Sequence, residues 1–164
     1  MPPTVYWGGE VSSSIASSLL AAAQSLATPL DIAVSPMSAL KKPDLVALSS
    51  SPDPLIFILQ TAENAEPPED AERLLGYFKR RTHPDTLLNG VRFAVLGVGD
   101  SNLLLDRQST SAKDCNQAAQ LLDRRLGELG GGRLLERGEA DERTGLEEVG
   151  PWIEGLLSVL GGGA

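Results

Sequence analysis

The chain has few of the residues on which many functional sites depend. It contains one cysteine and one histidine in 164 residues, which excludes an internal disulfide and a zinc site built from Cys and His ligands. Aromatic residues make up only 4% of the sequence. No apolar run approaches the roughly 20 residues of a membrane-spanning helix, and no basic segment near the start leads into an apolar one. We therefore expect neither a membrane span nor a signal peptide.

Positive charge is scarce as well. The sequence has 14 Lys and Arg residues against 22 Asp and Glu residues, a formal net charge of -8. Nucleic acids and anionic membranes bind basic faces, so we expect neither as a partner. The charge fits a protein partner that presents a basic face, although on charge alone solubility is the better explanation. A single cysteine and no signal peptide favour a cytoplasmic location without a bound metal.

Five short apolar segments alternate with stretches of helical periodicity. We expect strands over residues 4–7, 30–34, 55–59, 91–98 and 133–135. We expect helices over residues 12–27, 69–81, 113–129 and 147–160, and a short, ambiguous helix broken at Pro43 within residues 38–50. This alternation predicts an α/β domain, a parallel sheet with helices on both faces. The domain spans residues 1–160, followed by a flexible glycine-rich tail over residues 161–164.

Each expected helix carries apolar residues at helical spacing, which gives it one face toward the core. Leu26 belongs to this face in the first helix, Leu121 in the third and Trp152 in the last. These three side chains are therefore predicted to be buried. Pro151 falls within the first turn of the last helix, where proline is tolerated.

The carboxyl ends of the strands are the place to look for a ligand. In open parallel sheets, ligands bind beyond these ends, near the point where the strand order reverses. The loops over residues 8–14, 60–70 and 97–116 follow the first, third and fourth expected strands. We expect any functional site to lie in these three loops.

Several motifs between residues 66 and 141 point to a family. Residues 66–71 read EPPEDA and residues 96–102 read LGVGDSN; CN at 115–116 is followed by LLDRRLGELG at 121–130, and RGEAD stands at 137–141. In this order and spacing they resemble the flavin-mononucleotide (FMN) domain of the diflavin reductases, within that family the methionine synthase reductase group. The resemblance implies a flavodoxin-like three-layer sandwich whose five-stranded parallel sheet has the order 2-1-3-4-5.

The resemblance also implies a set of FMN contacts in the three loops. Glycines, hydroxyl groups and the start of a helix can hold a phosphate, because backbone N–H groups then approach the anion. The implied cofactor-binding residues are Gly8, Gly9, Ser12, Ser13, Thr61, Asn64, Gly97, Gly99, Asp100, Asn102, Leu103 and Asn116.

Each loop also departs from the family pattern. In the first, Glu10 and Val11 replace a threonine and a glycine, and two unit charges about 4 Å apart repel by about 4 kcal/mol at an effective dielectric constant of about 20. Alternatively, the serines at 12–14 only cap a helix. In the second, Ala62, Glu63 and Ala65 replace a stacking residue and two glycines, and in the third Leu103 replaces a stacking tyrosine.

Two functions of different class follow from this pattern. The departures favour a flavodoxin-like domain with weak or lost FMN binding, which serves as an interaction or structural module. The alternative is an FMN-dependent electron-transfer domain. It would pass electrons from an NADPH reductase module to a haem, cobalamin or iron–sulfur acceptor, and would not be a complete enzyme.

Overall fold

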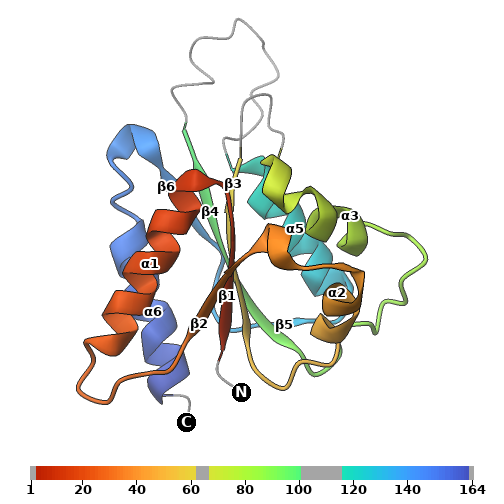
Figure 1. The fold of residues 1–164 in the computed structure, drawn as a ribbon, viewed down its shortest axis with the longest axis horizontal. Coiled ribbons are helices and arrows are strands. Elements are labelled where there is room, and N and C mark those ends of the chain that lie inside the picture. The colour runs from red at the N-terminus through yellow and green to blue at the C-terminus, as the bar shows by residue number, and fades with distance from the viewer. Residues whose placement is uncertain (1–2, 62–66, 101–115, 163–164) are drawn as a thin grey trace, which may run out of the picture.

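A parallel sheet lies between two layers of helices in the computed structural model of the chain, which describes residues 3–61, 67–100 and 116–162 (Figure 1). The strands are β1 (Thr4–Gly8), β2 (Ala33–Pro36), β3 (Leu55–Gln60), β4 (Arg92–Gly99), β5 (Gly132–Arg133) and β6 (Gly138–Asp141). The helices are α1 (Glu10–Gln24), α2 (Lys42–Leu48), α3 (Glu72–Phe78), α5 (Gln117–Glu128) and α6 (Val149–Gly162). Single 3-10 turns are η1 (Met37–Ala39), η3 (Glu69–Ala71) and η4 (Glu142–Thr144).

The strand order is β2-β1-β3-β4-β5, and all paired strands are parallel. The order predicted from the sequence is therefore confirmed. β6 pairs with β4 beyond β5, in parallel register, so two short strands share the last position of the sheet. Among the described residues, no helix combines the length and the apolar character needed to cross a bilayer.

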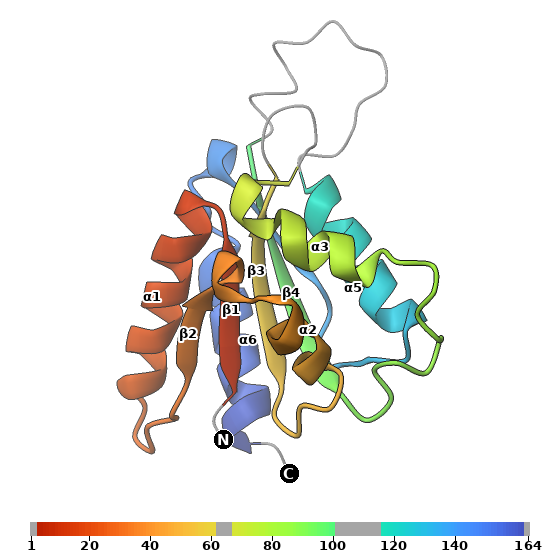
Figure 2. The ribbon, with the colours of Figure 1, turned by 45° about the vertical axis from the view of Figure 1, so that its right-hand side comes forward.

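The two faces of the sheet bury alternate residues of the central strands. Phe57 of β3 is fully buried on the face covered by α2, α3 and α5, while Ile56 and Ile58 are fully buried on the face covered by α1 and α6. Figure 2 shows these two helical layers on either side of the sheet. β3 is an unbroken apolar run because both of its faces are covered.

The region around β2 differs from the sequence prediction. The strand begins at Ala33 rather than residue 30, and it extends to Pro36. The ambiguous stretch that follows forms η1 and then α2. Pro43 does not break this helix. It lies in the first turn of α2, where its missing N–H has no intrahelical partner to lose.

Two leucines assigned to the core are on the surface instead. Leu26 is 37% exposed, because α1 ends at Gln24 and the helical spacing no longer applies beyond it. Leu121 is 38% exposed and lies on α5 next to the buried Leu122. Trp152, near the start of α6, is buried in the core between this helix and the sheet, as predicted.

The last strand position is interrupted. The register against β4 advances by two residues between β5 and β6, so the intervening segment leaves the sheet. The buried carboxylate of Asp123 accepts hydrogen bonds from Arg133 Nε and Arg137 Nη1, each at 3.0 Å. These contacts hold both ends of the segment between β5 and β6 against α5. Of the strand expected over residues 133–135, only Arg133 lies in a strand, at the end of β5, and β6 was not expected from the sequence.

Candidate functional site at the carboxyl edge of the sheet

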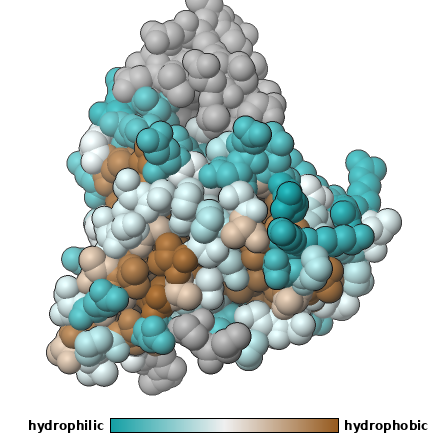
Figure 3. All heavy atoms as spheres, in the orientation of Figure 1, coloured by the Kyte–Doolittle hydropathy of each residue, from teal (hydrophilic) through white to brown (hydrophobic). Residues whose placement is uncertain are grey.

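β1, β3, β4 and β6 end together at one edge of the sheet, the upper edge in Figure 1, which we call the carboxyl edge. Figure 3 shows hydrophilic side chains gathered around this end of the molecule. Three of the predicted contacts, Asn64, Asn102 and Leu103, lie outside the described residues. The same holds for the second-loop departures over residues 62–65.

The start of α1 is capped by side chains from other elements. The Gly9 N–H donates to both carboxylate oxygens of Asp70, at 3.1 and 3.2 Å. The Val11 N–H donates to Gln60 Oε1 at 3.1 Å. Asp70 comes from η3 and Gln60 from the end of β3. Backbone donors at a helix start thus bind the protein's own acceptors, one of which is negatively charged.

Gly9 is required by this arrangement. Its φ angle is 102°, in the region that favours glycine. A Cβ atom at this position would lie 2.5 Å from Gln60 Oε1, well inside contact distance. Gly8, one residue earlier, is also closely packed, since a Cβ there would lie 2.9 Å from Met37 Sδ. Gly8 therefore lines the packed interior at the end of β1.

The serines after Gly9 do not cap the helix. Gly9 is the N-cap residue, and no side chain of the N-cap forms the capping bond. The alternative interpretation of these serines as caps is therefore wrong. Ser13 donates its N–H to the Gly9 carbonyl at 3.1 Å, which closes the first turn. The Ser12 hydroxyl is fully buried and has no hydrogen-bond partner in the described part of the chain.

Three other predicted contacts meet at the start of α5. Thr61, just after β3, accepts the Ala118 N–H on its Oγ1 at 3.1 Å. Asn116 Nδ2 donates to the Ala140 carbonyl of β6 at 3.3 Å. A Cβ atom on Gly97 would lie 2.6 Å from Asn116 Oδ1. Thr61, Gly97 and Asn116 are thus brought together, and in this arrangement they fasten α5 to the sheet.

The carboxyl edge is acidic where β4 and β6 end. Gly99 is the last residue of β4 and is paired with Asp141 of β6, and Asp100 follows directly. Burial of the Glu142 carboxyl, and then the charges of Asp100 and Asp141, raise its pKa above the ordinary value of 4.5. Carboxylates of three residues are therefore close enough to influence one another. An anion placed here would meet repulsion, and a cationic group would be attracted.

Sequence reasoning missed the two side chains that cap α1. Asp70 lies in the EPPEDA turn, which served only as a family marker, and Gln60 is the last residue of a strand. Both act on backbone groups far away in the chain, since Gly9 and Asp70 are 61 residues apart. No local pattern signals such a contact. In the described residues no three His, Cys, Asp or Glu side chains group as metal ligands would.

A parallel sheet of order 2-1-3-4-5, with glycines and a helix start at its carboxyl edge, defines the class of flavodoxin-like domains. The family described as Flavodoxin matches residues 15–152, and this chain belongs to that family. The similarity extends to curated reductases. The chain is 35% identical to methionine synthase reductase of Bos taurus over 118 residues, covering 71% of this chain and 16% of that protein.

A second relative supports the same relationship. NADPH-dependent diflavin oxidoreductase 1 of Dictyostelium discoideum is 35% identical over 109 residues, covering 65% of this chain and 16% of that protein. The resemblance to the diflavin reductases is thereby confirmed, and this chain spans 16% of the length of these two curated relatives. Oxidised flavodoxin 1 from Bacillus cereus superposes with a TM-score of 0.65 at 18% identity, covering 96% of both chains, which confirms the fold.

Proposed function

We propose that this chain is a flavodoxin-like interaction or structural module in which FMN binding is weak or lost. The observation that carries the proposal is the capping of α1. The Gly9 and Val11 N–H groups, which lie where the family places a phosphate, already bind Asp70 and Gln60. The residues at this position therefore fit an FMN phosphate poorly.

Two energetic terms oppose the binding of a phosphate at the start of α1. A phosphate would have to displace the Asp70 carboxylate from Gly9, and hydrogen bonds to charged groups contribute roughly 1.5–3 kcal/mol each. It would also meet the negative charges of Asp70 and of Glu10 in the first turn of α1. Those charges are favourable beside a helix start only while no other anion competes for it.

The acidic side of the carboxyl edge supports a protein partner with a basic face. Asp100, Asp141 and Glu142 lie close together there, and the whole chain carries a formal net charge of -8. Charges of one sign steer an oppositely charged partner and raise its association rate. We further propose a cytoplasmic location for this interaction.

One observation favours the alternative function, an FMN-dependent electron-transfer domain. The buried Ser12 hydroxyl in the first turn of α1 lacks a hydrogen-bond partner in the described residues, and a phosphate oxygen would supply one. FMN would provide the redox chemistry, taking electrons from an NADPH reductase module and passing them to a haem, cobalamin or iron–sulfur acceptor.

The visible spectrum and an FMN titration separate the two functions. The first function predicts a colourless purified protein, and flavin fluorescence that is unchanged by the protein up to millimolar concentrations. A yellow preparation with flavin absorbance, or tight quenching of FMN fluorescence, would establish the alternative. Titration with riboflavin, which has no phosphate, shows whether any binding depends on the phosphate end.

A further inference from the structure

A pocket of about 590 Å³ lies at the opposite end of the sheet from the candidate site. Its walls include the first residues of three strands, Thr4, Ala33 and Leu55, and the loop that precedes β3. We call it the amino-edge pocket. Its volume is within the range of small-molecule sites, roughly 300–1,000 Å³. It shares no lining residue with the capped start of α1.

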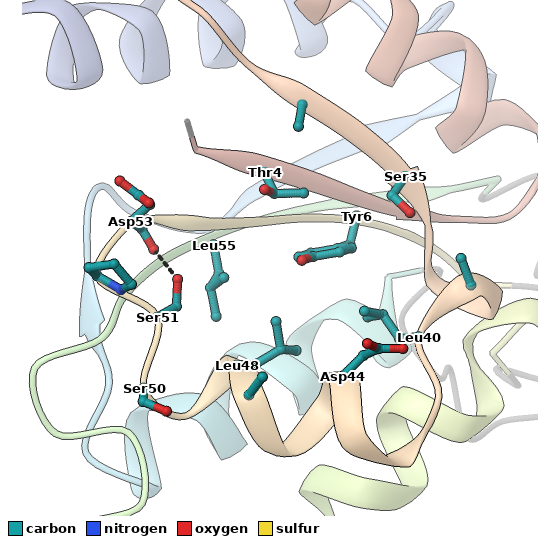
Figure 4. A pocket seen from close by; sticks show the side chains of 14 residues that line it. Thr4, Tyr6, Ser35, Leu40, Asp44, Leu48, Ser50, Ser51, Asp53 and Leu55 are labelled. Carbon is teal, nitrogen blue, oxygen red and sulfur yellow. Dashed lines mark hydrogen bonds between the residues drawn. The ribbon is translucent and has the colours of Figure 1, made fainter. Parts of the chain in front are cut away.

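The pocket exists because α2 is short and its neighbours are small. α2 has only 7 residues. Alanines at 33, 39 and 47 and a serine at 35 line the opening, so few atoms fill the space between helix and sheet. Figure 4 shows Tyr6 and Leu55 on the sheet side, opposite Leu48 and Asp44 on the α2 side.

Apolar side chains form much of the pocket wall. Leu40, Leu48 and Leu55 line it and are themselves almost completely buried. The Tyr6 ring stacks on Phe57, its register partner on β3, with 5.9 Å between ring centroids. Tyr6 is held at the wall by this contact, and it is only partly buried. An apolar or aromatic ligand body would find a preformed surface here.

The charged side chains that line the pocket are both carboxylates. Asp44 and Asp53 line it, with hydroxyl groups of Thr4, Tyr6 and Ser35, and the lining contains no Lys, Arg or His. Burial raises the pKa of the Tyr6 hydroxyl above 10.0, a hydrogen bond with Thr4 lowers it, and the charge of Asp44 raises it. The Asp44 carboxylate therefore acts on the pocket interior. A cation is favoured in this space, and an anion is not.

We propose that the amino-edge pocket binds a small organic amine. Its apolar or aromatic body would pack on Leu48, Leu55 and the Tyr6 ring, and its ammonium group would lie beside the Asp44 carboxylate. The ring of Tyr6 adds a cation–π contribution. This binding is independent of FMN and of the carboxyl edge.

Three probes of similar shape and different charge test the proposal on the isotopically labelled chain. The amine is 2-phenylethylamine, the anion is 3-phenylpropionate and the neutral probe is 2-phenylethanol, each titrated while amide NMR shifts are recorded. We expect saturable shifts with the amine, centred on Tyr6, Ser35, Asp44, Leu48 and Leu55, and at least about tenfold weaker binding of the anion. Equal binding of all three, shifts centred elsewhere, or no saturable shift would overturn the proposal.

Matched variants place the ammonium group. Asp44→Asn removes the charge but keeps an oxygen for the Lys41 N–H, which Asp44 accepts at 3.0 Å. Glu154→Gln removes a charge from an exposed position on α6 and serves as the control. Amine affinity should fall about tenfold in the first variant and stay unchanged in the second. Unchanged affinity in Asp44→Asn would contradict the proposal.

Ala47→Trp, which fills the opening from the surface, should abolish binding of the amine, and retained binding would contradict the pocket's role.

Discussion

At the scale of single residues, Asp70 occupies a backbone donor at the start of α1. Its carboxylate accepts the Gly9 N–H on both oxygens, so a negative charge already satisfies this donor. Gln60 holds the neighbouring donor with a neutral amide. The charge of Asp70 repels an incoming phosphate, whereas its hydrogen-bonding role can be filled by an uncharged oxygen. These two properties can be separated by substitution.

Asp70→Asn should therefore increase affinity for FMN while the fold is kept. The Asn side chain retains an acceptor for Gly9 and lacks the charge, so we expect at least about a tenfold gain, which corresponds to about 1.4 kcal/mol. FMN fluorescence quenching measures it. Asp85→Asn, which removes an exposed charge outside the carboxyl edge, is the control. Equal affinities in the wild type and Asp70→Asn would remove Asp70 from the explanation.

Gly9→Ala should destabilise the protein more than Gly145→Ala. Both glycines have positive φ angles, 102° and 70°, but only Gly9 lacks room for a Cβ atom. A non-glycine residue in such a conformation costs about 1–3 kcal/mol, and the contact with Gln60 adds to this at Gly9 alone. Urea unfolding of both variants measures the difference. Equal losses would mean that the Gln60 side chain simply moves aside.

Glu142 gives the carboxyl edge a dependence on pH. Because its pKa in the folded protein lies above 4.5, the folded state keeps this proton to higher pH than the unfolded chain does. Its contribution to stability is therefore present below pH 4.5 and is lost as the pH rises through the folded pKa.

Glu142→Gln should raise the urea midpoint relative to wild type at pH 7, and by less at pH 3.5. Glu147→Gln, in the same connection to α6, serves as the control for a generic loss of charge. A gain in Glu142→Gln that is the same at both pH values would contradict the raised pKa of Glu142.

At the scale of elements, the sequence predicts the buried strands and misses what depends on packing at their ends. β3 and β4 are continuous apolar runs, so their position and burial follow directly from composition. β6 reads Gly-Glu-Ala-Asp, which has no strand signature. It becomes a strand because β5 pairs only with the start of β4, which leaves the end of β4 to pair with β6. α2 was equally ambiguous, because its proline can either begin a helix or break one.

The start of α5 shows how one hydroxyl can join elements. Thr61 is only 5% exposed and lies between β3 and α5. Its hydroxyl oxygen accepts the Ala118 N–H. Thr61→Val keeps the shape and leaves this N–H without its acceptor, so we expect a loss of about 1–3 kcal/mol in the free energy of unfolding.

Thr82→Val, at an exposed position after α3, is the control and should change stability little. Chemical denaturation measures both variants. A stability loss in Thr61→Val no larger than in the control would show that α5 is held by its apolar face alone.

At the scale of the whole molecule, fold and site differ in how far the sequence determines them. The two helical layers follow from the alternation of apolar and helical segments, the strand order follows from the family resemblance, and both are confirmed. The candidate site depends on contacts such as Gly9 with Asp70, 61 residues apart, which no local pattern encodes. Of the residues implied by the resemblance, Thr61, Gly97 and Asn116 make contacts within the protein itself. Their proposed roles toward a flavin stay predictions.

The most direct test of the account is an FMN titration followed through the backbone amides of Gly9 and Val11 by NMR. We expect both resonances to keep their positions up to millimolar FMN, because Asp70 and Gln60 retain these N–H groups. Saturable shifts of both resonances at micromolar FMN would show that a phosphate displaces the protein's own acceptors, and would contradict the central claim.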